Sequence, residues 1–137
     1  MVDSMKILHI IAGAEQGGAE SCAVDTIRAL HNAGVEQTVI SRPHKTFRTL
    51  VKDCAIKHHI LSFNRILKWV QKTKINVIIK NEKPDLVHCW LNRAASFTPY
   101  QKTVPVLGWF GGYYDLKHYK SCDFFMGVTK DIVHYIG

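Results

Sequence analysis

The sequence lacks a long hydrophobic run, and we do not expect its first residues to be a secretory leader. No apolar stretch approaches the roughly 18 residues that a membrane-spanning helix needs. The longest apolar run near the start, Ile7–Ala14, is interrupted by His9 and leads into a glycine-rich segment. It has neither the basic segment nor the small-residue cleavage site of a signal peptide. We therefore expect a soluble, cytoplasmic protein.

Closely spaced cysteines are also missing. The cysteines lie more than 30 residues apart and form no C-x-x-C pair, at Cys22, Cys54, Cys89 and Cys122. This spacing argues against a zinc site, and the missing secretory signal argues against a disulfide framework. The adjacent histidines His58 and His59 lie in a predicted strand, where their rings face opposite ways and cannot clamp one metal ion. We predict four reduced thiols, mostly buried, and no metal site.

The composition is that of one globular domain. The chain has 137 residues, of which 47% are apolar and 21% charged, and both fractions are ordinary for folded proteins. Intrinsic disorder is therefore not expected, and residues 1–137 are predicted to form a single domain. Neither internal repeats nor low-complexity stretches are present.

The net charge is +7, which can favour nucleic acid, an anionic membrane surface or phosphate-bearing ligands. Between residues 45 and 83 the basic residues alternate with aliphatic ones, at Lys45, Arg48, Lys52, Lys57, Arg65, Lys68, Lys72, Lys74, Lys80 and Lys83. This scatter is typical of solvated helix faces rather than of a nucleic-acid-binding arm. Contact of this region with an anionic partner is the alternative, and nucleic acid is not a predicted partner.

Short β-rich runs alternate with amphipathic segments along the chain. The predicted strands are Met5–Ala12, Glu36–Ser41, Lys57–Phe63, Asp85–Trp90, Val104–Phe110 and Asp123–Val128. The predicted helices are Ala19–Ala33, Phe47–Asp53, Arg65–Lys83 and Asn92–Gln101, with a helical turn at Asp115–Tyr119 and a last helix from Thr129. This alternation predicts parallel strands joined by right-handed crossovers, hence a doubly wound α/β fold. The last helix stops about two turns after Thr129, so we expect the chain to be a fragment of a longer protein.

Candidate binding residues follow the strands, because ligands of open α/β sheets bind beyond the carboxyl ends of the strands. The segment Gly13–Ala19 follows the first strand and opens the first helix, where backbone amides can bind phosphate. Its glycines do not fit the dinucleotide pattern G-x-G-x-x-G, and no Lys-Ser/Thr pair follows as in a Walker A loop. A phosphate or diphosphate cradle is the favoured interpretation, and a tight turn that needs glycine is the alternative.

Three other strand ends carry candidate residues. Trp90, Asn92 and Arg93 could stack on a sugar and hydrogen-bond to it, and His88 precedes them in the strand. A single histidine in such a position, like His88, is more often packed in the core than catalytic. The remaining two ends hold Gly111–Tyr114, with two aromatic side chains, and the pair Thr129 and Lys130. Ser-His-Asp, H-E-x-x-H and paired-carboxylate arrangements are absent, so no catalytic residue is assigned.

Three of these segments, taken in order, resemble a known family. MKILHIIAGAEQGGAES at the start, KPDLVHCWLNRAA in the middle and CDFFMGVTKDIV near the end are similar to the amino-terminal domain of GT-B glycosyltransferases. The nearest group is the retaining group 1, family 4, and the GGYYDLKHYKSCDFFMGVTKDI segment resembles its lipopolysaccharide and cell-envelope members. The resemblance runs from about Met5 to Ile136.

The resemblance implies a Rossmann-like domain that mainly binds the acceptor and faces a second, donor-binding domain across a cleft. It places Gly17 and Gly18 against the diphosphate of a nucleoside-diphosphate sugar, a substrate rather than a cofactor. It places further residues beside the sugar or the acceptor: His88, Trp90, Asn92, Arg93, Gly112, Tyr113, Thr129 and Lys130. No divalent cation is implied.

Two features depart from the family pattern. Many members carry a histidine where this chain has Trp90, and the E-x7-E motif of the donor-binding domain is absent from these 137 residues. The chain alone is therefore predicted to be inactive.

The predicted function is the transfer of a sugar from a nucleoside-diphosphate donor to a lipid- or glycan-linked cell-envelope acceptor. It would take place in the cytoplasm, with peripheral contact at the inner face of the membrane. The alternative is a non-catalytic α/β module that binds an anion or a partner. A nucleotide-binding oxidoreductase is a weaker alternative, because G-x-G-x-x-G and an acidic residue after EQTVIS are missing.

Overall fold

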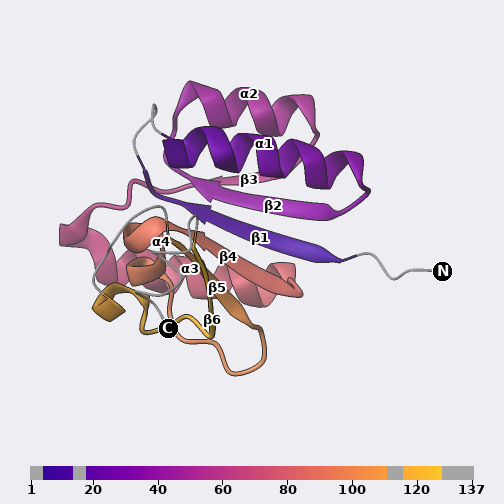
Figure 1. The fold of residues 1–137 in the computed structure, drawn as a ribbon. Helices are drawn as coiled ribbons and strands as arrows, with labels where there is room; N and C mark the ends of the chain where they lie inside the picture. The colour runs from indigo at the N-terminus through magenta and orange to yellow at the C-terminus, as the bar shows by residue number, and fades with distance from the viewer. Residues whose placement is uncertain (1–4, 14–17, 111–115, 128–137) are drawn as a thin grey trace.

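The computed structural model describes residues 5–13, 18–110 and 116–127, which build one six-stranded parallel sheet (Figure 1). The strands, in the spatial order β3-β2-β1-β4-β5-β6, are β1 (Lys6–Ile11), β2 (Glu36–Ser41), β3 (Lys57–Ile60), β4 (Leu86–Trp90), β5 (Val106–Phe110) and β6 (Phe124–Gly127). The helices are α1 (Gly18–Asn32), α2 (Lys45–Asp53), α3 (Lys68–Glu82) and α4 (Leu91–Phe97), with 3-10 helices η1 (Arg65–Leu67) and η2 (Leu116–Tyr119). The prediction of a Rossmann-like, doubly wound α/β domain is confirmed.

The spatial order of the strands changes direction between β1 and β4. β2 and β3 lie on one side of β1, and β4, β5 and β6 lie on the other. β1 pairs with β2 on one side and with β4 on the other, and Ile11 lies opposite both Ser41 and Trp90. The three strands therefore end together, and the segments that follow them meet at one edge of the sheet. Such a switch point is where open α/β sheets bind ligands.

Helices cover the two faces of the sheet. α1 and α2 lie over β1–β3 on one face, and α3 and α4 lie on the other (Figure 1). Alternate residues of β1 and β4 enter different cores, because successive side chains of a strand point to opposite faces. Leu8 and Cys89 belong to the core under α3 and α4, whereas Ile11 and Trp90 belong to the core under α1 and α2.

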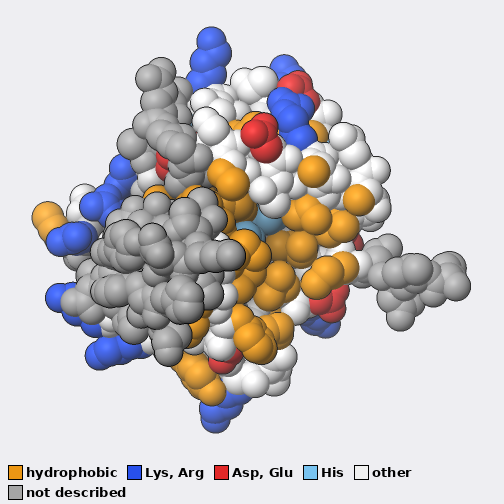
Figure 2. Space-filling model, in the orientation of Figure 1, with side chains coloured by type: hydrophobic (Ala, Val, Ile, Leu, Met, Phe, Trp, Pro, Cys, Tyr) orange, Lys and Arg blue, Asp and Glu red, His pale blue; other side chains and the backbone are white. Residues whose placement is uncertain are grey.

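Part of the face that bears α1 and α2 carries exposed hydrophobic side chains. Figure 2 shows hydrophobic residues gathered over the strands next to α1. Phe124 and Met126 of β6 pair in register with Leu107 and Trp109 of β5, and both β6 side chains are exposed. The described helices leave this end of the face uncovered.

Several predicted boundaries were wrong by a few residues. The third strand ends at Ile60 rather than Phe63, because Phe63 takes a φ of 55° and turns its ring into the core. The helix predicted from Arg65 begins as η1, where the side chain of Asn64 accepts a hydrogen bond from the Ile66 amide. α3 ends before Pro84, as predicted, and its β-branched Ile75 and Ile79 are buried in the core.

Proline explains two further differences. The helix predicted over Asn92–Gln101 ends at Phe97, because the residue before Pro99 is biased away from helical backbone. β5 begins at Val106, since Pro105 has no amide hydrogen to donate. The helix predicted from Thr129 lies outside the described residues.

The four cysteines are free thiols. Cys54 and Cys89 are buried, and Cys22 and Cys122 are partly buried. Among the described residues, no helix is long and apolar enough to cross a membrane.

Candidate functional site

The candidate site lies at the carboxyl ends of β1, β2 and β4. Gly13 follows β1, Arg42 and His44 follow β2, and Arg93 lies in the first turn of α4 after β4. We call these residues, together with Asn92, the carboxyl-edge site. Because the three strands are neighbours in the sheet, residues far apart in the sequence share one edge here.

Gly13 lies close to the side chain of Glu20. A Cβ atom on Gly13 would overlap the carboxylate of Glu20, which is buried in the first turn of α1. The Nε2 atom of His44 donates a hydrogen bond to the Gly13 carbonyl at 3.3 Å. A larger residue at position 13 would therefore require the Glu20 carboxylate to move, and His44 ties the segment after β2 to the end of β1.

Two arginines give this edge positive charge. The pKa of Arg42 is lowered by burial and then by the positive charge of Arg93, so the two guanidinium groups are near enough to repel each other. The Nε atom of Arg42 is buried without a hydrogen-bond partner among the described residues. An anion between the guanidinium groups would relieve the repulsion and could satisfy that nitrogen.

Arg93 is one of the residues predicted from the sequence, whereas Arg42 was missed. The available signal was its position directly after the strand EQTVIS. That signal becomes informative only when β2 is known to lie beside β1.

The Trp90 indole lies in the core and not beyond the strand end, which corrects its expected position. Trp90 is the last residue of β4, and its side chain is 2% exposed. Its Nε1 atom donates a hydrogen bond to Nδ1 of His9 at 3.1 Å, and its ring packs against Trp109. In this arrangement the indole is not open to a sugar, and it anchors the turn that leads to Asn92 and Arg93.

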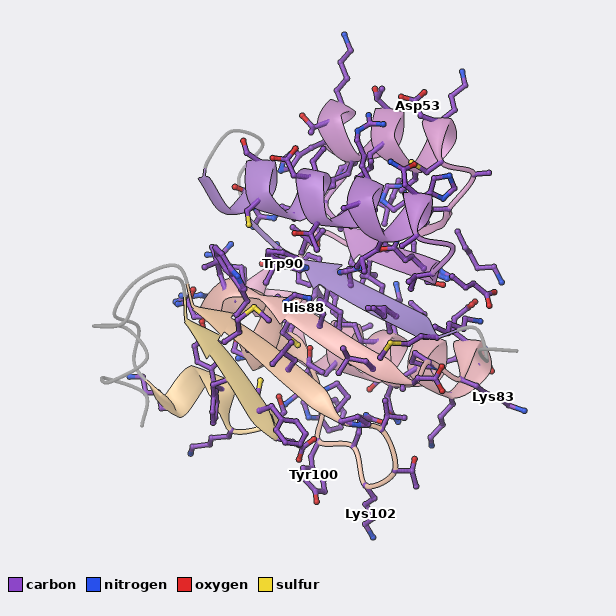
Figure 3. The ribbon with its side chains drawn as sticks, turned by 45° about the vertical axis from the view of Figure 1, so that its right-hand side comes forward. Asp53, Lys83, His88, Trp90, Tyr100 and Lys102 are labelled. Atoms are coloured by element: carbon purple, nitrogen blue, oxygen red, sulfur yellow. The ribbon has the colours of Figure 1, made fainter. Side chains whose placement is uncertain are left out.

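His88 stacks on Trp90 inside the same core, with ring centroids 4.3 Å apart (Figure 3). Burial, followed by the nearby His9, lowers the pKa of His88 to about 3. The Nε2 atom of His88 is buried and has no partner among the described residues. His88 is therefore neutral at physiological pH, as a packed histidine would be.

His9 is held by a chain of hydrogen bonds across the sheet. Its Nε2 atom donates to Oε1 of Gln37 at 2.8 Å, because the Gln37 amide nitrogen already donates to the Ile27 carbonyl at 2.9 Å. Nδ1 is then the acceptor for Trp90. Burial lowers the pKa of His9 to about 4, against a smaller raising effect of the Gln37 hydrogen bond.

The turn after β4 has strained backbone. Leu91 takes a φ of 72°, a conformation that costs a non-glycine residue about 1–3 kcal/mol. Its side chain packs against the core under α1 and α2. Asn92 and Arg93 follow it and are partly exposed, which leaves their polar groups accessible at the carboxyl edge.

The remaining predicted site residues are not assigned to the carboxyl-edge site. Gly18 is the first residue of α1, whereas Gly17, Gly112, Tyr113, Thr129 and Lys130 lie outside the described residues. In the part of the chain that the structure describes, no three His, Cys, Asp or Glu side chains gather as metal ligands. His58 and His59 do have different partners, the Ser41 hydroxyl at 2.7 Å and the Glu82 carboxylate at 3.7 Å.

No family model matches the chain. Known proteins are nevertheless similar to it in sequence. It is 29% identical over 130 residues to the lipopolysaccharide core biosynthesis glycosyltransferase LpsD of Rhizobium meliloti, covering 93% of this chain and 38% of that protein. It is 31% identical over 137 residues to LpsE of the same organism, covering 96% and 39%. The chain thus spans about two fifths of the length of these relatives.

Solved structures share the fold at low sequence identity. A glycosyltransferase from Rickettsia africae superposes with a TM-score of 0.73 at 19% identity, covering 98% of this chain and 39% of the other. The lipopolysaccharide outer core galactosyltransferase WaaB gives 0.65 at 19% identity, covering 96% and 42%. Anabaena HepE in complex with UDP and glucose gives 0.58 at 17% identity, covering 85% and 32%. The chain is a Rossmann-like α/β domain with the fold found in glycosyltransferases, similar in sequence to part of two lipopolysaccharide core enzymes.

Proposed function

We propose that the chain is the acceptor-side domain of a GT-B glycosyltransferase of the retaining group. The enzyme would move a sugar from a nucleoside diphosphate to a lipid- or glycan-linked cell-envelope acceptor. One observation carries the proposal: the carboxyl-edge site joins a close-packed glycine turn and two arginines at the switch point of the sheet. The similarity to two lipopolysaccharide core glycosyltransferases supports the substrate class.

The residues divide into two proposed roles. Backbone amides at Gly17 and Gly18 would contact the donor diphosphate, where the amino terminus of α1 favours an anion. The carboxylate of Glu20 reduces that positive character, so Arg42 and Arg93 would supply the remaining positive charge. A phosphate held by both guanidinium groups would be bound by charge-assisted hydrogen bonds.

The sugar and the acceptor would lie next to these groups. Asn92 would hydrogen-bond to a sugar hydroxyl, and His88 and Trp90 would hold the turn that presents it. Gly112, Tyr113, Thr129 and Lys130 complete the proposed acceptor side. The main catalytic contribution would be electrostatic stabilisation of the departing diphosphate by amides and guanidinium groups that are already in place.

The groups that bind most of the nucleotide-sugar donor are proposed to come from polypeptide outside these 137 residues. The curated relatives are about two and a half times as long as the matched segment, which leaves room for a second domain. On this proposal the chain alone does not transfer sugar. We also propose that the enzyme works in the cytoplasm, at the inner face of the membrane.

A non-catalytic anion-binding module remains the second candidate, because an arginine pair binds phosphate without any chemistry. Titration calorimetry with nucleoside-diphosphate sugars and with inorganic phosphate separates the two. For a transferase, Arg42→Gln or Arg93→Gln in the longest available form of the protein should weaken binding of the nucleotide sugar at least about tenfold. Arg28→Gln is the matched control, because Arg28 is exposed and pairs with Asp53 between α1 and α2. Equal affinity for inorganic phosphate and for every nucleotide sugar would favour the module.

A further inference from the structure

We propose that a hollow at the amino edge of the sheet binds a saccharide that carries a phosphate or carboxylate group. The amino edge is where β4 and β5 begin, so it lies at the opposite end of the strands from the carboxyl-edge site (Figure 3). The hollow measures about 580 Å³, a size that suits a small-molecule ligand. The side chains that we assign to ligand binding in this amino-edge hollow are Asn76, Lys80, Lys83, Tyr100, Gln101 and Lys102.

Two segments that are distant in the sequence form the hollow. The last two turns of α3 line one part of it, and residues 99–105, which lead from α4 to β5, line another. Ile79 and Pro84 are buried in the lining, and Val104 is half-buried. Apolar side chains below a small number of polar groups are typical of sites for small molecules.

The hollow has positive charge that no carboxylate in its lining balances. Lys80, Lys83 and Lys102 have no ion-pair partner among the described residues. The nearest acidic residues in the sequence are already engaged, because Glu82 is paired with lysines of β1 and β3, and Asp85 accepts a hydrogen bond from a β1 amide. The carboxyl end of α3 offsets only about half an elementary charge. An anionic group would therefore be attracted to the hollow.

Two side-chain amides in the hollow suit a hydroxyl group. The Nε2 atom of Gln101 donates hydrogen bonds to Oδ1 of Asn76 at 3.0 Å and to the Pro99 carbonyl at 3.2 Å. Nδ2 of Asn76 and Oε1 of Gln101 then have no partner in the part of the chain that the structure describes. A hydroxyl can accept from the first atom and donate to the second. This pair favours a saccharide over a bare phosphate.

Tyr100 offers an aromatic surface next to these groups. It is 66% exposed and lies near the start of β5, on the same side of the molecule as Lys83 and Lys102 (Figure 3). The C–H face of a sugar ring packs on such a ring. A protein partner fits less well, because lysine is depleted in protein–protein interfaces. Charge, the amide pair and the aromatic ring together indicate an anionic saccharide.

NMR titration of the full, ¹⁵N-labelled chain tests the hollow. The probes are glucose 6-phosphate and glucuronic acid, and the comparison ligands are glucose and inorganic phosphate. We expect one or both anionic sugars to shift the side-chain amide signal of Asn76 and the backbone amides of residues 100–104. Their affinity should exceed that of glucose and of inorganic phosphate at least about tenfold, because the anionic sugar alone makes both kinds of contact. A response to only one of the two probes identifies the anionic group.

Substitutions test which residues bind the probe. Lys80→Glu/Lys102→Glu should weaken binding at least about tenfold. The matched control is Lys45→Glu/Lys52→Glu, which makes the same charge change and also removes a lysine from the last turn of a helix. It should retain the binding. Tyr100→Ala, with an unchanged melting temperature, should weaken binding of the anionic sugar and leave that of inorganic phosphate as it is.

Four results would overturn the proposal. These are absent shifts with both anionic sugars, equal affinity for inorganic phosphate, equal loss in both lysine pairs, and loss of binding in Arg42→Gln/Arg93→Gln. The second result would indicate a site for the free anion, and the last would place the probe at the carboxyl-edge site. The arginine pair also separates this proposal from the proposed function, since it should lower nucleotide-sugar binding and leave the amino-edge hollow unchanged.

Discussion

At the scale of single residues, the histidines near the carboxyl edge are structural groups. His9 makes hydrogen bonds with Gln37 and Trp90, and His88 stacks on Trp90, so both are held neutral in the core. A general base for sugar transfer would need access to substrate and a pKa near the working pH. Neither histidine meets these conditions in this arrangement, and the partly exposed Asn92, Arg42 and Arg93 are the residues that we propose contact ligands.

Both histidines make folding stability depend on pH. Their folded pKa values, about 4 for His9 and about 3 for His88, lie below the ordinary 6.5, so the unfolded chain binds more protons between these limits. Stability is therefore complete above about pH 6.5 and is lost as the pH falls. Each histidine should cost about 2 kcal/mol at pH 5 relative to pH 7.5. Urea unfolding at a series of pH values measures this loss.

His88→Leu provides the matched comparison for that experiment. Leucine keeps an apolar side chain on Trp90 and removes the buried nitrogen without a partner. We expect similar stability at neutral pH and a loss on acidification that is smaller by about 2 kcal/mol. His58, whose pKa is lowered by burial and by neighbouring charges, acts in the same direction in both proteins. An unchanged slope would mean that His88 is open to solvent.

At the scale of elements, β5 depends on a glycine. A Cβ atom on Gly108 would lie 2.6 Å from Cδ1 of Tyr119 and 2.9 Å from Sγ of Cys122. Tyr119 is buried, and its hydroxyl donates a hydrogen bond to the Trp109 carbonyl at 3.3 Å, so the ring cannot move away freely. The strand and η2 therefore fit together only around glycine.

Gly108→Ala should destabilise the domain by about 1–3 kcal/mol, because overpacking forces neighbouring side chains out of position. Thermal or urea unfolding checks this value. Gly34→Asn is a suitable control, since Gly34 has a φ of 84° and open space around it, and asparagine tolerates that backbone. A loss in Gly108→Ala no larger than in the control would show that η2 does not pack on β5 as described.

Comparison of the predicted and observed strands shows which features of the fold the sequence can predict. β2 was predicted over its full length, and β1 and β4 to within a residue, because their apolar runs end at glycine, proline or polar residues. β3 was predicted to extend too far. The turn at Phe63 depends on packing of its ring in the core, and the local sequence pattern does not show that packing. Trp90 was predicted correctly as the last residue of its strand, but its side chain was expected to be open to a sugar, because its partner His9 lies 81 positions away in the chain. Arg42 was missed for the same reason, as its neighbour Arg93 belongs to another strand end.

At the scale of the whole molecule, the topology of the sheet decides where the carboxyl-edge site lies. β1, β2 and β4 are neighbours in the sheet, so the segments after them, which carry Gly13, Arg42 and Arg93, meet at one edge. The crossover from β3 to β4 carries α3 to the face opposite α1 and α2 (Figure 1).

The most direct test of the account is a sugar-transfer assay with the longest available form of the protein. The assay should use nucleoside-diphosphate sugars and membrane extract as acceptor, and it should measure both nucleoside diphosphate release and labelled product. We expect transfer with retained anomeric configuration, a fall in kcat/KM of at least about tenfold for Arg93→Gln, and no transfer by residues 1–137 alone. Tight binding of nucleotide sugars or phosphate without transfer to any acceptor would contradict the transferase assignment and leave an anion-binding module.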